Sequence, residues 1–185
     1  KPKKTLTNNF PHTGEQHSIV ILMEFKDKKF STMDTPQQYY TNAMNQQGFT
    51  AKNGANGSAR DFFIASSNGM FSPTFDVYGP VQINYNQHDA GQGTYNTTIN
   101  MGTFVKAAIE GLDDVVDFSK YDHDGDGFVD NVYIYYAGNG AADSDDTQTI
   151  WPHAFDLRKW NINLTTNDGV GIGSYTCSNE VDGTR

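Results

Sequence analysis

The stretch that decides the fold spans residues 122–137 and reads DHDGDGFVDNVYIYYA. Its first half places aspartates at positions 122, 124, 126 and 130 around Gly127. Its second half, residues 129–136, is rich in β-branched and aromatic residues and contains neither Gly nor Pro, which indicates a buried strand. We therefore expect a metal-binding loop that leads directly into a strand near the middle of the fold.

The spacing of the aspartates is typical of a loop that wraps oxygen ligands around Ca2+. If Asp122 is the first position, Asp124 and Asp126 take the third and fifth, and Gly127 makes the sharp turn at the sixth. Carboxylates this close repel one another unless a cation neutralises them. The predicted Ca2+ ligands are the carboxylates of Asp122, Asp124, Asp126 and Asp130 and the carbonyl group of Phe128.

Two alternatives bear on this loop. The twelfth position is Tyr133 and not the bidentate Glu of an EF-hand, and no helical pattern flanks the loop, which argues against a helix-loop-helix sensor. A non-helical site can take a further oxygen from Asp117 or from a distant loop. The other alternative is a solvated Asp-Gly turn held by hydrogen bonds from side chains to the backbone.

Length and charge limit the possible functions. A chain of 185 residues corresponds to one domain with a real core. A net charge of −9 disfavours nucleic acid and anionic membranes as partners, because both would be repelled. The apolar run over residues 19–23 is far too short to span a membrane. The single cysteine, Cys177, excludes an internal disulfide, and the abundance of Asn, Gly, Thr and Tyr favours a secreted or cell-envelope protein.

Hydrophobic periodicity predicts helices and strands in alternation. Residues 1–17 are expected to form a tail or linker, and residues 18–185 a single domain that opens with a buried strand ending at residue 25. Thr35 and Ser58 are predicted to cap two helices, the second with Phe62 and Phe63 facing inward. Apolar residues recur at intervals of three and four over residues 100–112, which predicts a third helix. Further strands are expected at residues 71–81, 150–155, 160–164 and 171–179.

Several short segments follow one another in a recognisable order. They are residues 19–25 (IVILMEF), 57–63 (GSARDFF), 68–71 (NGMF), 75–80 (FDVYGP), 121–130 (YDHDGDGFVD), 136–138 (YAG), 150–153 (IWPH) and 175–180 (YTCSNE). In this order and spacing the chain resembles the first part of the catalytic domain of the immune inhibitor A family of secreted bacterial metallopeptidases. The resemblance implies an α/β fold of zincin type, a mixed sheet with covering helices that is incomplete here. It also implies a zinc-dependent metalloendopeptidase that cleaves a protein or peptide substrate.

The chain departs from that family in one respect. It contains no His-Glu-x-x-His sequence, the helix motif on which zincins carry Zn2+. The five histidines are His12, His17, His88, His123 and His153, and none is nominated as a zinc ligand. We therefore expect residues 18–185 to be the N-terminal part of a catalytic domain, inactive alone, whose partner is the remainder of that domain and whose Zn2+ ligands lie outside this chain.

Other functions are weighed against this one. The rival is a calcium-stabilised extracellular adhesion or carbohydrate-binding module. Cys177 with His153 as base is a second alternative, but a cysteine within a strand pattern is usually a core residue, and His153 is expected to pack structurally. If the zincin resemblance holds, residues 171–180 are expected to form a sheet edge that borders the substrate cleft.

Overall fold

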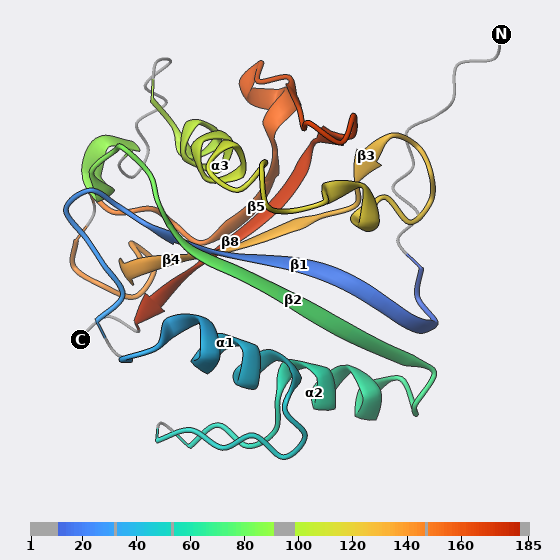
Figure 1. Cartoon of the computed structure of the whole chain (residues 1–185). Coiled ribbons are helices and arrows are strands. Elements are labelled where there is room, and N and C mark those ends of the chain that lie inside the picture. Colours follow the sequence, from blue (N-terminus) through green and yellow to red (C-terminus); the bar gives the residue numbers. More distant parts are fainter. Residues whose placement is uncertain (1–10, 32, 53, 91–98, 147, 182–185) are drawn as a thin grey trace, which may run out of the picture.

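The computed structural model describes residues 11–31, 33–52, 54–90, 99–146 and 148–181 (Figure 1). These residues form a mixed α/β fold, as the sequence predicts. The larger sheet has five strands in the order β2-β1-β4-β8-β5, of which the first four are parallel and β5 is antiparallel to β8. Its strands are β1 (Gly14–Glu24), β2 (Phe71–Gln82), β4 (Val132–Asn139), β5 (His153–Asp156) and β8 (Ser174–Val181).

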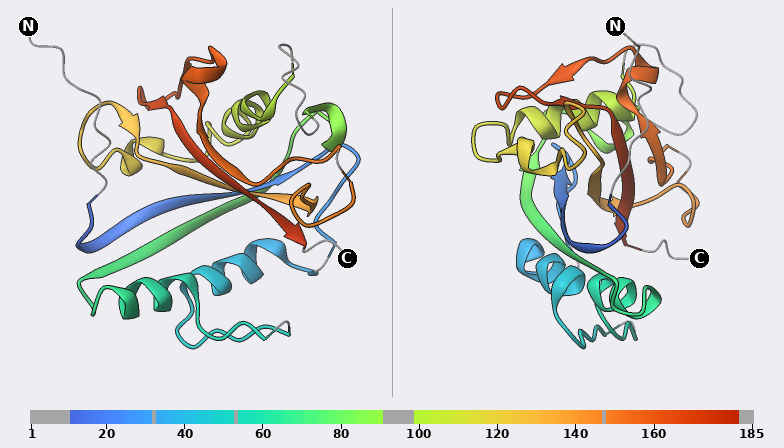
Figure 2. Two further views of the ribbon diagram at one scale, coloured as in Figure 1. Left: turned by 180° about the vertical axis from the view of Figure 1, so that it is seen from behind. Right: turned by 90° about the vertical axis from the view of Figure 1, so that its right-hand side faces the viewer.

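A second, smaller sheet has the order β3-β7-β6. Its strands are β3 (Phe128–Val129), β6 (Leu164–Thr165) and β7 (Gly171–Ile172). Three α-helices are described, α1 (Pro36–Asn45), α2 (Ala59–Ser66) and α3 (Met101–Glu110), together with the 3-10 helices η1 (Gln87–Ala90), η2 (Phe118–Tyr121) and η3 (Leu157–Trp160). Helices α1 and α2 lie on one side of the larger sheet and α3 lies on the other (Figure 2).

The position of β1 inside the sheet explains its continuous apolar run. Ile19, Ile21 and Met23 belong to the core cluster that contains the buried side of α3. Leu22 points to the opposite face, where it clusters with Tyr40 of α1. A strand covered on both faces needs apolar residues at successive positions and not at alternate ones. The strand begins at Gly14, so the last residues of the predicted tail belong to the sheet.

The central strand begins and ends three residues later than predicted, at Val132 and Asn139. The expected strand over residues 129–136 is divided into β3 and β4, because Asp130 and Asn131 lead the chain from the smaller sheet into the larger one. Strand β4 lies third of five, between β1 and β8, which confirms the prediction that this region occupies the middle of the fold.

The predicted edge over residues 171–180 is wrong. Its second part, β8, is paired on both sides, parallel with β4 and antiparallel with β5. The sequence predicts a strand here but not the strands that pair with it. Strand β5 pairs with β8 although η3, β6 and β7 lie between them along the chain. The edges of the described five-stranded sheet are β2 and β5.

The inward orientation predicted for the aromatic pair of α2 is also wrong. Phe62 is 66% exposed and Phe63 is 38% exposed, and none of the described residues of α2 is buried. Helix α2 packs against the edge strand β2 and not over the centre of the sheet (Figure 1). The Phe63 ring still contacts the rings of Phe71 and Phe75 on β2.

The two predicted helix caps differ. The Ser58 hydroxyl accepts a hydrogen bond from the Asp61 N–H, and the Asp61 carboxylate accepts one from the Ser58 N–H, which together form a capping box. Thr35 precedes Pro36 as predicted, but its side chain makes no capping hydrogen bond in the described helix α1. Asn100 caps α3 through Thr103 in the same reciprocal way as Ser58.

This difference gives a matched test. Ser58→Ala is expected to lower the free energy of unfolding by about 1 kcal/mol, because the helix loses the side chain that satisfies an N-terminal N–H. Thr35→Ala, which removes a hydroxyl without a capping bond, is expected to cost clearly less. Urea denaturation of both variants measures the two values. Equal losses would contradict the assigned roles.

Candidate metal centre

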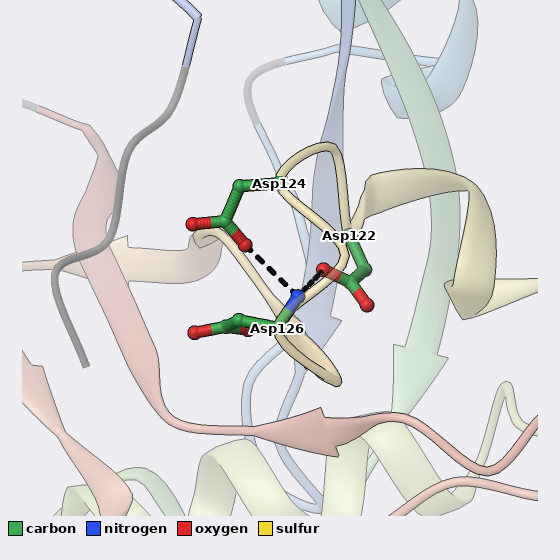
Figure 3. A group of neighbouring side chains, drawn as sticks. All are labelled: Asp122, Asp124 and Asp126. Carbon is green, nitrogen blue, oxygen red and sulfur yellow. Dashed lines mark hydrogen bonds between the residues drawn. The ribbon is translucent and has the colours of Figure 1, made fainter. Parts of the chain in front are cut away.

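The loop between η2 and β3 brings three of the predicted ligands together. One carboxylate oxygen each from Asp122, Asp124 and Asp126 lies within 4.8 Å of the others (Figure 3). All three residues are half-buried. Oxygen ligands in a short, turning loop suit Ca2+, which accepts irregular coordination by carboxylates, carbonyl groups and water.

Backbone hydrogen bonds fix these carboxylates. The Asp126 N–H donates to Asp122 Oδ1 at 3.0 Å and to Asp124 Oδ1 at 3.1 Å. Gly127 N–H donates to Asp122 Oδ2 at 2.9 Å, and Phe128 N–H donates to Asp126 Oδ1 at 2.9 Å. The bonds expected of an Asp-Gly turn are therefore present. A carboxylate oxygen has two lone pairs, so it can accept a hydrogen bond and bind a cation at the same time.

The glycines of the loop are needed for its shape. Gly125 has φ 67° and Gly127 has φ 90°, a backbone conformation that residues with a Cβ rarely adopt. These two turns allow successive aspartates to face the same point. Gly127 occupies the position at which the sequence predicts the sharp turn.

The fourth aspartate has a different environment. Asp130 is 4% exposed and lies outside the group formed by the other three. Its Oδ2 accepts hydrogen bonds from the imidazole Nδ1 of His123 at 2.8 Å and from the His123 N–H at 3.2 Å. Burial raises the pKa of Asp130, while the hydrogen bonds from His123 act in the opposite direction. Ligation by Asp130 and by the carbonyl group of Phe128, the first residue of β3, stays a prediction.

Asp117 has a structural role at the entrance to this loop. Its carboxylate accepts hydrogen bonds from the N–H and the hydroxyl group of Ser119, at 3.2 and 2.5 Å. It thereby caps η2, the short helix that leads into the loop. The same hydrogen bonds lower the pKa of Asp117.

The structure also brings together the alternative pair of Cys177 and His153. They face each other on β8 and β5, with Sγ 3.5 Å from Nδ1. Burial raises the pKa of the Cys177 thiol to about 12, so the thiolate that a nucleophile requires does not form at neutral pH. His153 bonds through Nδ1 to the Trp151 carbonyl at 2.6 Å and through Nε2 to the Tyr175 hydroxyl at 2.8 Å. These bonds hold its ring inside a packed cluster.

Sequence reasoning missed the contact between His17 and Asp76, whose side chains lie 2.8 Å apart. The two residues are 59 positions apart and meet only because β1 pairs with β2, so no local pattern reveals them.

Among the described residues, no helix is long and apolar enough to cross a membrane. No protein-family model matches the sequence, and a search of curated proteins finds no match.

Proposed function

We propose that this chain is the N-terminal part of a secreted, zinc-dependent metalloendopeptidase domain and that Ca2+ stabilises it. The proposal rests on the arrangement of the segments that carry the family resemblance. Segments 19–25, 75–80, 136–138 and 175–180 fall largely in β1, β2, β4 and β8, which lie side by side in one sheet. Segments scattered along the chain thus contribute to a single structural unit.

The calcium part of the proposal is supported by the position of the loop. The triad of Asp122, Asp124 and Asp126 precedes β3, and β4 follows two residues later. A cation bound there would remove the repulsion among the carboxylates where the chain passes into the centre of the fold. Binding energy at this point contributes directly to the stability of the folded state.

The zinc ligands of such an enzyme would come from residues outside positions 1–185, since the sequence contains no His-Glu-x-x-His motif. Zn2+ held by two helix histidines polarises the substrate carbonyl and activates a water molecule, with the intervening Glu as general base. Residues 1–185 would supply the sheet against which that helix packs.

The substrate edge of the proposed enzyme is β5 and not the segment predicted from the sequence. Strand β5 pairs with β8 on one side only in the described sheet, and Phe155 on it is 42% exposed. An extended peptide can add to such an edge through backbone N–H and carbonyl groups. Cleavage would then depend on backbone shape as well as on side chains.

The proposal is tested with two polypeptides from the same gene, residues 1–185 and a chain extended past Arg185. Each is assayed on a denatured protein substrate with and without a zinc chelator. We expect no cleavage by residues 1–185 and chelator-sensitive cleavage by the extended chain. Chelator-sensitive cleavage by residues 1–185 would contradict the proposal. An inactive extended chain without a His-Glu-x-x-His motif would favour the calcium-stabilised binding module.

A further inference from the structure

The outer side of β2 faces no other strand of the described sheet. Gly14, at the start of β1, donates a hydrogen bond to the Met70 carbonyl, so the backbone groups of even-numbered β2 residues face β1. The N–H and carbonyl groups of residues 71, 73, 75 and 77 therefore face outward. An edge strand whose outward groups are unpaired is a template on which another chain can add a strand.

An asparagine of α1 takes the place of a neighbouring strand at the centre of this row. The Phe75 N–H donates to Asn45 Oδ1 at 2.8 Å, and Asn45 Nδ2 donates to the Phe75 carbonyl at 2.9 Å. A residue on a paired antiparallel strand makes the same two hydrogen bonds. Asn45 Nδ2 also donates to the Thr41 carbonyl at 3.1 Å, which holds the amide against its own helix.

Three further outward positions are closed in related ways. Gln37 Nε2, at the start of α1, donates to the Val77 carbonyl at 3.1 Å. The hydroxyl of Ser67, the C-cap of α2, accepts a hydrogen bond from the Phe71 N–H at 2.9 Å and lies 3.2 Å from the Phe71 carbonyl oxygen. Pro73 has no N–H to offer. Both helices beside β2 thus contribute to closing its edge.

In the part of the chain that the structure describes, the opposite edge strand, β5, is not closed in this way. The Leu157 N–H donates to the Gly173 carbonyl at 2.9 Å, so the backbone groups of Ala154, an odd number of residues away, face away from β8. Ala154 is exposed, and no described side chain bonds to its backbone groups. Closure by side chains is therefore a property of β2 and not of both edges.

We propose that Asn45, Gln37 and Ser67 close β2 against strand addition, and that the strand they exclude is β2 of a second copy of this chain. The same strand in two copies can pair antiparallel about a twofold axis, so each copy offers the other a matching edge. Charge within the strand gives little protection, because its one charged residue is Asp76, whose carboxylate bonds within its own chain. Peptide addition at β5 belongs to the proposed function, whereas closure of β2 is independent of it.

The test compares two double variants of α1 in the full chain. Gln37→Ala/Asn45→Ala opens the β2 edge at two positions. Gln38→Ala/Asn42→Ala is the matched control, because it removes the same two residue types from the same helix, and the amides that it deletes bond to each other at 2.9 Å. Sedimentation velocity over a range of protein concentrations measures the oligomeric state, and melting curves establish that each variant is folded. We expect a dimer for Gln37→Ala/Asn45→Ala and monomers for the wild type and the control.

Hydrogen exchange identifies the strand that pairs. At concentrations where Gln37→Ala/Asn45→Ala is monomeric, its Phe75 N–H is expected to exchange about tenfold faster than in the wild type, because the acceptor is lost. On dimerisation, protection is expected to return to residues 71–77. Asn45→Ala alone is expected to dimerise at a higher concentration, and it replaces the double variant if that variant does not fold.

Three results would overturn the proposal. The first is a folded Asn45→Ala or Gln37→Ala/Asn45→Ala variant that stays monomeric at every concentration. The second is equal dimerisation by the wild type or by the control variant. The third is protection on dimerisation that appears in β5 and not in β2.

Discussion

Replacing Phe25 by alanine is expected to lower the free energy of unfolding by about 3–5 kcal/mol, among the largest effects of any single substitution in this chain. Phe25 follows β1 and is fully buried between the sheet and α3. Its ring lies 5.5 Å from that of Phe104 and 6.3 Å from that of Tyr136. Removal of the ring leaves a cavity among rigid aromatic neighbours that cannot close it.

Phe62→Ala is the matched control for this prediction. Phe62 is 66% exposed, so loss of its ring is expected to change the free energy of unfolding by no more than about 0.5 kcal/mol. Urea denaturation of both variants gives the comparison. A loss for Phe62→Ala as large as that for Phe25→Ala would show that α2 is buried against something other than the described sheet.

The contrast between these phenylalanines shows what a sequence pattern can and cannot predict. Helix α3 is predicted correctly because its apolar residues repeat at three and four, and the side that they form packs on the sheet. Helix α2 is predicted correctly in extent and cap but not in orientation. Its two adjacent aromatic residues do not define a side, and the partner that covers it is an edge strand.

The candidate metal centre was predictable to the extent that it is local. Asp122, Asp124 and Asp126 lie within five residues and are turned together by two glycines, so their spacing predicts their meeting. Asp130 shares the spacing, but it lies in the turn between β3 and β4, where its carboxylate bonds to the His123 ring. The spacing alone does not predict this contact. The edge role of β5 depends on strand pairing between segments about 20 residues apart, which has no local signature.

Removal of Ca2+ is the second prediction with a large expected effect. A ligand that binds only the folded state at 100 to 1,000 times its Kd stabilises that state by about 2.7–4.1 kcal/mol. For a domain of this length, that corresponds to a fall in Tm of roughly 5–15 °C when a chelator is added. The physical cause is the repulsion among the carboxylates of Asp122, Asp124 and Asp126, which the cation removes.

Two substitutions separate a specific site from a general effect of charge. Asp126→Asn keeps an oxygen that can accept the hydrogen bond from Phe128 N–H but removes a charged ligand, and it is expected to abolish most of the Tm shift. Asp145→Asn removes the same charge from an exposed residue in the loop that follows β4, and it is expected to retain the full shift. A Tm that ignores Ca2+ and chelator in the wild type would refute the stabilising role of the ion.

Anomalous diffraction from crystals grown with Ca2+ tests the central claim most directly, because it locates the ion among its ligands. We expect one anomalous peak between the carboxylate oxygens of Asp122, Asp124 and Asp126, and no peak at that position in Asp126→Asn crystals. Wild-type crystals with no peak at the loop, grown at a Ca2+ concentration that fails to change the Tm, would contradict the account.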